Sequence, residues 1–423
     1  MHKSPVIAVG KIVRVFARLR GGGSALPGLV VERLDPSFLP WVLGKLPRGV
    51  VLVSGTNGKT TTTKIVVELL ESQGLKVFTN PSGSNFIRGV LASVVSQVSL
   101  TGKLNADIAV LELDEAHAVR FVKLVKPRYS LLLNVMRDQL DRFGEIDTTA
   151  KMLETIAMAT TETVVINRED SRLRKIGANM SNVSYYGLSD EVRTSFPSDD
   201  ELYANADEAP HPELPPAYVI LTDVAESHAS FTIGDTTHDA SLILRGSYNV
   251  FNAAGAIALT RVVCGTELRT DALFARLSTV RPAFGRGETL TVNGKPCELV
   301  LIKNPGGFRL ALSSFNPTGY ATMIAINDAY ADGRDVSWLW DVNCDSLRPE
   351  GVSTVSGVRA YDMALRLTYD DVPFTTIEPD LTQAVSSFIA ANADAPKRIY
   401  CTYTAMLKIR SLLKNYTRVE KVL

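Results

Sequence analysis

The sequence lacks a net charge and a long apolar run. Its 423 residues contain 45 lysines and arginines against 45 aspartates and glutamates. A neutral chain has no global field that would hold nucleic acid, so a polyanion-binding role is disfavoured. The longest candidate for a membrane span, residues 310–327, contains Asn316, Pro317 and Gly319 and does not fit one.

Cysteine is scarce and scattered. Cys264, Cys297, Cys344 and Cys401 form no C-x-x-C pair, so the sequence contains no readable zinc ribbon. Scattered cysteines fit a reducing compartment, where buried thiols act as small apolar side chains. We therefore expect a cytoplasmic protein without structural zinc.

The N-terminal segment is basic and amphipathic. Residues 5–20 are mainly apolar, but Lys11, Arg14 and Arg18 interrupt them and no small-residue cleavage site follows. A signal peptide is therefore not indicated. We expect a helix that ends at the glycines of residues 21–23, within a short leader of residues 1–44.

From Gly49 onward, short apolar runs alternate with stretches of helical spacing. This alternation predicts parallel βαβ units in a doubly wound α/β sheet. The acidic, proline-rich residues 195–216 are interpreted as a surface loop of the same domain. Strands are expected at residues 50–53, 77–78, 108–113, 129–134 and 164–167, with a helix at 61–73.

A second α/β region follows Arg281. Its strands are expected at residues 299–302, 321–326 and 398–401. Because domains average roughly 150 residues, the length fits two or three of them. We expect the leader at 1–44, a central domain at 45–287 and a smaller C-terminal α/β domain at 288–423.

The strongest signal for chemistry is the run Ser54-Gly55-Thr56-Asn57-Gly58-Lys59-Thr60-Thr61 between a strand and a helix. This is the context of a phosphate loop, in which backbone N–H groups and a helix N-terminus surround phosphate oxygens. We expect a surface turn in which Lys59 reaches the β- and γ-phosphates of ATP and Thr60 binds Mg²⁺. The alternative is a fortuitous Gly-Lys-Thr turn. The expected ATP contacts are Gly55, Thr56, Asn57, Gly58, Lys59, Thr60 and Thr61.

An acidic residue, Glu112, lies near the end of the strand expected at 108–113. A carboxylate at this edge of a parallel sheet can hold Mg²⁺, although many strand-end acids are merely solvated. Glu112 and Thr60 are therefore the expected metal ligands.

Several segments resemble elements of the Mur ligase family. The loop has the shortened form G-T-N-G-K-T-T that Mur ligases and folylpolyglutamate synthases share. Residues 134–144 resemble the family's T-N-x-x-x-D-H-L-D-x-x-G segment, 246–253 its G-x-x-N-x-x-N-A element, and 281–288 its G-R-x-E turn. The resemblance implies a Mur-ligase-type central domain with a P-loop for ATP, and further ATP contacts from Asn249, Asn252 and Arg286.

The C-terminal part resembles the MurT type of this family. The matching segments are residues 303–308, 332–341, 359–367 and 403–407. Gln139 stands where ordinary Mur ligases have His, and residues 300–305 replace their D-Y-A-H-N-P segment. Lys151 lies where Mur ligases carry a carbamylated lysine, and the alternative for it is a solvated helix lysine.

The MurT resemblance implies an ATP-dependent amide-forming ligase of peptidoglycan synthesis. Its substrate would be the D-glutamate α-carboxylate of the lipid II stem peptide, activated as an acyl phosphate at the inner face of the membrane. Only 44 residues precede Lys45, too few for the domain of roughly 100 residues that would bind a UDP-linked precursor. A folylpolyglutamate-synthase-like ligase and a non-catalytic ATP-binding scaffold are the alternatives.

The chain has no recognisable glutaminase of its own. No cysteine lies in a nucleophile elbow, and the five histidines pair with none in sequence. The resemblance implies that ammonia comes from a GatD-like glutamine amidotransferase. Trp338 and Trp340 stand beside acids, and tryptophan is enriched at interfaces. We hypothesise that Asp335 or Asp341, with a preference for Asp335, orients the catalytic histidine of this partner; the alternative is that both tryptophans anchor a helix.

Overall fold

The computed structural model describes residues 3–19, 25–80, 85–137, 146–193, 196, 213–225, 227–244, 246–281 and 286–419. The chain forms two compact units. The first comprises Met1–Val135, Asp147–Ile243 and Asn249–Val280, and the second comprises Met136–Ile146, Leu244–Tyr248 and Arg281–Leu423. The helices of the expected leader belong to the first unit, and the division into 1–44, 45–287 and 288–423 stays a prediction.

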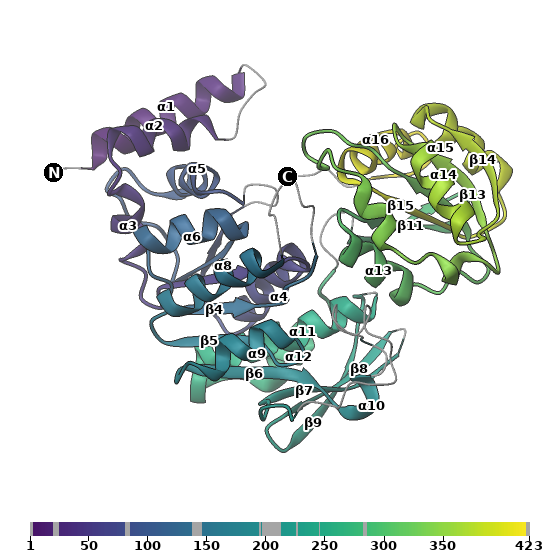
Figure 1. Ribbon diagram of the computed structural model, residues 1–423. Coiled ribbons are helices and arrows are strands. Elements are labelled where there is room, and N and C mark those ends of the chain that lie inside the picture. The colour runs from purple at the N-terminus through teal and green to yellow at the C-terminus, as the bar shows by residue number, and fades with distance from the viewer. Residues whose placement is uncertain are drawn as a thin grey trace. The chain divides into compact units, whose positions relative to one another are not determined.

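The first unit is built on a nine-stranded sheet in the order β2-β3-β1-β4-β5-β6-β7-β8-β9 (Figure 1). Strands β2 to β7 pair in parallel, and β8 and β9 are added antiparallel. The strands are β1 (Val50–Ser54), β2 (Val77–Thr79), β3 (Ile108–Glu112), β4 (Tyr129–Leu132), β5 (Thr163–Asn167), β6 (Val183–Leu188), β7 (Val219–Val224), β8 (His228–Ile233) and β9 (Thr236–Ser241).

Helices connect the parallel strands and enclose them. Every residue of β1, β3 and β4 is buried, as expected for parallel strands covered on both faces. The helices are α1 (Ser4–Leu19), α2 (Leu26–Leu34), α3 (Phe38–Leu43), α4 (Lys59–Ser72), α5 (Ile87–Gln97), α6 (Glu115–Leu124), α8 (Ile146–Ala159), α9 (Ser171–Ala178), α10 (Asp190–Arg193), α11 (Ser247–Cys264), η1 (Gly265–Glu267) and α12 (Thr270–Leu277). Within the described ranges, none of the helices is both long and apolar enough to cross a membrane.

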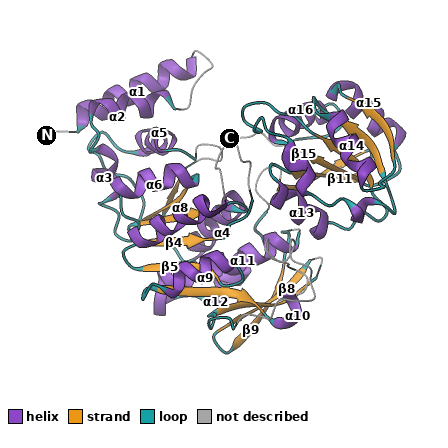
Figure 2. Ribbon diagram, in the orientation of Figure 1, coloured by secondary structure: helices purple, strands orange, loops and turns teal. Residues whose placement is uncertain are grey.

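The second unit contains a six-stranded sheet in the order β10-β11-β15-β12-β13-β14. Strand β10 is antiparallel to β11, and the other pairs are parallel. Figure 2 shows helices around its strands. The elements are β10 (Arg286–Val292), β11 (Lys295–Leu301), α13 (Pro305–Ser314), β12 (Ala321–Ala325), η2 (Ser337–Asp341), η3 (Asp345–Leu347), β13 (Val352–Ser356), α14 (Ala360–Tyr369), β14 (Phe374–Glu378), α15 (Leu381–Ala391), β15 (Lys397–Cys401) and α16 (Tyr403–Leu413).

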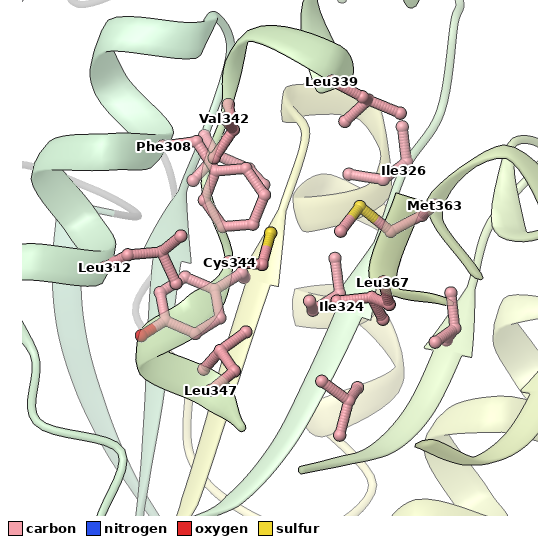
Figure 3. Close-up of a cluster of buried hydrophobic side chains, with 14 of the residues drawn as sticks. Phe308, Leu312, Ile324, Ile326, Leu339, Val342, Cys344, Leu347, Met363 and Leu367 are labelled. Atoms are coloured by element: carbon pink, nitrogen blue, oxygen red, sulfur yellow. The ribbon is translucent and has the colours of Figure 1, made fainter. Parts of the chain in front are cut away.

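Alternation along the strands divides the core of this unit into two layers. Ile324 of β12 and Tyr400 of β15 face α13 and α14, whereas Met323 and Ile399 face α15 and α16. This is the period of two that places successive strand residues on opposite faces. Figure 3 shows part of the first layer, a buried cluster to which Phe308 and Leu312 of α13 and Ile324 of β12 all belong. The α/β fold with a parallel sheet and a smaller second sheet is therefore confirmed.

The buried Arg366 of α14 fixes the segment that contains η2. Its guanidinium donates to the carbonyl oxygens of Leu339 (3.2 Å) and Val342 (2.6 Å) and pairs with Asp370. The second oxygen of Asp370 accepts the N–H of Cys344 at 2.7 Å. One arginine and one aspartate thus hold residues 339–344 onto α14.

Replacing Arg366 by Met should lower the free energy of unfolding by about 3 kcal/mol, because Asp370 and two carbonyl groups would lose a buried charged partner. Arg348→Met is the matched control. Arg348 is half exposed, pairs with Asp345 three residues earlier and donates to the carbonyl oxygen of Asp370 at 2.6 Å, so its loss should lower stability by only about 1 kcal/mol. Denaturant unfolding of both variants tests the prediction, and equal losses would contradict it.

Candidate active site

The loop between β1 and α4 is shaped by two glycines with left-handed backbone angles. Gly55 has a φ of +137° and Gly58 a φ of +86°, values that other residues rarely adopt. A Cβ at Gly58 would lie 2.5 Å from Nδ2 of Asn252, so the close approach of α11 also requires glycine. Thr56, Asn57, Lys59, Thr60 and Thr61 are all buried. The loop is therefore not the surface turn that we expected.

Lys59 is the first residue of α4, and its ammonium group is turned into the loop. Nζ donates to the carbonyl oxygen of Gly55 at 2.6 Å and pairs with Oε1 of Glu115 at 2.9 Å. Burial raises the pKa of Glu115, and the charge of Lys59 opposes this shift. Glu115 is the first residue of α6, three positions after Glu112. The pair thus places a buried cation in the loop, where it can interact with a bound anion.

The two expected metal ligands lie together. The hydroxyl of Thr60 donates to Oε1 of Glu112 at 2.6 Å. Asn80, which follows β2, fixes the backbone of Glu112 by accepting its N–H at 3.0 Å and donating to its carbonyl oxygen at 2.9 Å. A hydroxyl and a carboxylate are hard oxygen donors of the kind that Mg²⁺ prefers. These residues could hold such an ion beside a bound phosphate.

Asn134, which follows β4, holds the other side of the loop. Its side chain accepts the N–H of Asn57 at 2.9 Å and donates to the Asn57 carbonyl oxygen at 3.0 Å. Its own carbonyl oxygen accepts the N–H of Thr56 at 3.0 Å. The next residue, Val135, donates to Asp170 at 2.6 Å, and burial raises the pKa of Asp170 to about 6. The strand expected to reach Asn134 ends at Leu132, so Asn134 is left to bind the loop.

Helix α11 brings Asn252 against the loop. Nδ2 of Asn252 is buried and has no hydrogen-bond partner within the part of the chain that the structure describes, and the same holds for the hydroxyl of Thr61. Buried polar groups are normally satisfied, so these atoms fit a site whose ligand supplies the missing partners. Asn249 lies one helical turn before Asn252 and is half-buried.

Several sequence predictions lie partly or wholly outside the described residues, among them the helix end at the glycines of residues 21–23 and the segments 134–144 and 281–288. Gln139 and most of the acidic segment 195–216 are among the omitted positions, and Arg286 begins β10 but its side chain is not described. Lys151 is exposed on α8.

The cysteines are buried and free. Burial raises the pKa of Cys297 and Cys344 to about 12, which keeps both thiols protonated. Among the described residues, no group of three or more His, Cys, Asp or Glu side chains could hold a metal ion. The expectation of no zinc stays a prediction.

The segment of residues 332–341 separates into anchoring and exposed parts. Asp332 is buried and accepts the N–H of Thr404 at 2.7 Å, which ties the segment to the N-terminal turn of α16. Trp338 is buried against Phe308, whereas Trp340 is 49% exposed and packs edge-on against Tyr369. The alternative in which both tryptophans are anchors therefore holds for the buried Trp338, whereas Trp340 is only partly covered.

The two candidate acids differ in their surroundings. Asp335 is half-buried and accepts the N–H of Ser337 at 2.8 Å, at the start of η2. Asp341 is exposed at the end of η2. Both acids lie in the second unit.

Comparison with known proteins gives two family matches. The family described as Mur ligase middle domain matches residues 53–260, and the family described as MurT ligase C-terminal matches residues 301–406. The solved structure of MurF ligase from Thermotoga maritima in complex with ADP has a TM-score of 0.69 at 18% identity. It covers 90% of this chain and 82% of that chain. This likeness concerns the fold.

Two curated relatives are similar over almost their whole length. The chain is 32% identical to the lipid II isoglutaminyl synthase (glutamine-hydrolyzing) subunit MurT of Streptococcus pneumoniae, over 96% of each chain. It is 27% identical to the subunit of the same name in Staphylococcus aureus strain COL, over 91% of this chain and 92% of that one. The chain therefore belongs to the MurT branch of the Mur ligase family, and it is a ligase that forms carbon–nitrogen bonds.

Proposed function

We propose that this chain is the synthetase subunit that amidates the α-carboxylate of D-glutamate in the lipid II stem peptide, with ATP as the energy source. The observation that carries the proposal is the loop of residues 55–61, which contains the buried ammonium group of Lys59. Thr61 in the loop and Asn252 beside it each have a buried polar atom without a hydrogen-bond partner among the described residues. The names of the MurT relatives supply the substrate. The reaction would take place in the cytoplasm, at the inner face of the membrane.

The proposed reaction has two steps. The γ-phosphoryl group of ATP passes to a carboxylate oxygen, and ADP leaves. Ammonia then attacks the acyl carbon, inorganic phosphate leaves with that oxygen, and the nitrogen loses a proton to give the amide. Positioning and charge stabilisation supply most of the catalysis in phosphoryl transfer.

The residues of the loop have separate tasks in this reaction. Lys59 would exchange its contact with Glu115 for phosphate oxygens, and the N–H groups at the start of α4 would face the same anion. Asn252 and Thr61 would donate to the nucleotide. A magnesium ion held by Thr60 and Glu112 would offset the charge of the phosphates.

Ammonia would come from a GatD-like glutamine amidotransferase. The relatives are described as subunits of a glutamine-hydrolysing enzyme, which supports a partner of this kind. The exposed Trp340 and the acids Asp335 and Asp341 lie on one short segment, where an acid could orient the catalytic histidine of the partner. The match of residues 301–406 to the MurT ligase C-terminal family favours this function over a folylpolyglutamate synthase or a scaffold.

The phosphate loop is tested by Lys59→Met combined with Glu115→Gln, which removes both buried charges together. ATP-dependent amidation should fall by about a thousandfold or more, because the developing charge loses its cation. The melting temperature should change little. Lys59→Ala alone leaves Glu115 buried without its cation and should also destabilise the protein by about 3 kcal/mol. Normal turnover of the double variant would exclude this nucleotide site.

The metal site is tested by Glu112→Gln, which can still accept from Thr60 but has no charge. The Mg²⁺ concentration for half-maximal activity should rise by about tenfold or more, because a charged oxygen ligand is lost. Asp114→Asn is the control, since Asp114 caps α6 by accepting the N–H of Ala116 and an amide oxygen can do the same. Identical Mg²⁺ titrations for Glu112→Gln and the wild type would remove Glu112 from the metal shell.

The partner site is tested by Asp335→Asn and Asp341→Asn in the complex. One of them should reduce glutamine-driven amidation by about a hundredfold or more, as expected when a catalytic histidine loses its acid. Amidation with added ammonium salt and the binding of ATP should stay at wild-type levels. Asp345→Asn is a control for the loss of an exposed acid nearby. If neither variant hydrolyses glutamine more slowly than the wild type, the segment is structural.

A further inference from the structure

Helix α1 carries an apolar face that no part of the described chain covers. Phe16 is 62% and Leu19 77% exposed, and Val9, Ile12 and Val15 are exposed as well. Ile12, Val15, Phe16 and Leu19 follow the spacing i, i+3, i+4, i+7, so they form one stripe along the helix. A contiguous apolar stripe of this kind marks an interaction surface.

The opposite face of α1 packs against helices α2 and α5. Ile7, Gly10 and Ala17 are buried there. A Cβ at Gly10 would lie 2.7 Å from Val31 of α2 and 2.8 Å from Val95 of α5, so α1 lies very close to both helices. Figure 1 shows α1 and α2 together at the edge of the first unit, over α5. The helix therefore cannot bury its stripe by turning over without losing this packing.

The charge on α1 has one sign. Lys11, Arg14 and Arg18 lie on it, and the first acidic residue of the chain is Glu32. At 100° per residue, Lys11 and Arg18 fall on one flank, between the exposed stripe and the buried face. Arg14 falls among the buried positions and donates to the carbonyl oxygen of Ser96 at 3.4 Å. Within the described part of the chain, Lys11 and Arg18 make no ion pair. The pKa of Arg14 is lowered mainly by burial, and the charge of Arg18 adds to this shift.

We propose that α1 is a docking helix for an anionic lipid bilayer, which inserts its apolar stripe among the acyl chains and places its basic flank at the headgroups. An apolar face bordered by lysine and arginine is the pattern of helices that lie in a membrane interface. An anionic bilayer offers acyl chains to the apolar stripe and negative headgroups to the basic flank. A protein partner would need an apolar surface and an acidic surface side by side to match the same helix. The inference goes beyond the proposed function and does not depend on it.

The experiment measures binding of the full chain to vesicles without lipid-linked muropeptide and without ATP. Wild-type protein should bind vesicles of equal parts phosphatidylcholine and phosphatidylglycerol, and bind phosphatidylcholine alone weakly. Ile12→Gln with Phe16→Gln should weaken binding by about a hundredfold or more, because two exposed apolar side chains that the bilayer would bury are lost. Lys11→Gln with Arg18→Gln should weaken binding to the anionic vesicles by about thirtyfold.

The matched control is Tyr361→Gln with Leu365→Gln, which removes two exposed apolar side chains of α14 in the second unit. It should bind vesicles like the wild type, and melting curves should show that all variants are folded. Failure of the wild type to bind would overturn the proposal, and so would equal loss in the control. Light scattering gives the oligomeric state of the wild type and of Ile12→Gln with Phe16→Gln. If the wild type is an oligomer, this variant is a monomer and vesicle binding is unchanged, the stripe binds a second copy of the chain instead.

Discussion

The buried ion pair between Lys59 and Glu115 is the constraint around which the first unit is arranged. Removing an ammonium group from water costs several kcal/mol unless an opposite charge and hydrogen-bond acceptors replace the water. Glu115 supplies the charge, and the carbonyl oxygens of Gly55 and Thr56 supply the acceptors. The ammonium group of Lys59 can therefore stay buried in the loop only because the first residue of α6, Glu115, lies beside it.

Strand order meets this requirement. Strand β1 lies between β3 and β4, so the segments that follow all three strands meet at one edge of the sheet. Glu112 and Glu115 reach the loop from the β3 side, and Asn134 reaches it from the β4 side. Helix α11, far along the chain, adds Asn252 against Gly58. Residues separated by almost two hundred positions thus form one site.

The sequence allowed the alternation of strands and helices, the loop and the proximity of Thr60 and Glu112 to be predicted, because each depends on local pattern or on the edge rule for parallel sheets. Their role as metal ligands stays a prediction. Glu115 was missed because it pairs with Lys59 only when β1 and β3 lie side by side, which brings the first residues of α4 and α6 together. The strand was expected to reach Asn134 because an apolar run precedes it, whereas the side chain of Asn134 binds the backbone of Asn57 in the loop. The anchors Asp332 and Arg366 were not recognised either, since both act on segments distant in sequence.

Arg366 and Asp370 have a consequence for association in the second unit. Their hydrogen bonds hold the backbone of residues 339–344, so the backbone that carries Trp340 and Asp341 is fixed by the chain itself. Ordering a loop at an interface costs conformational entropy, and this segment would lose little backbone entropy on binding. Association through this segment would therefore be close to rigid-body docking, with affinity set by shape and charge and not by coupled folding.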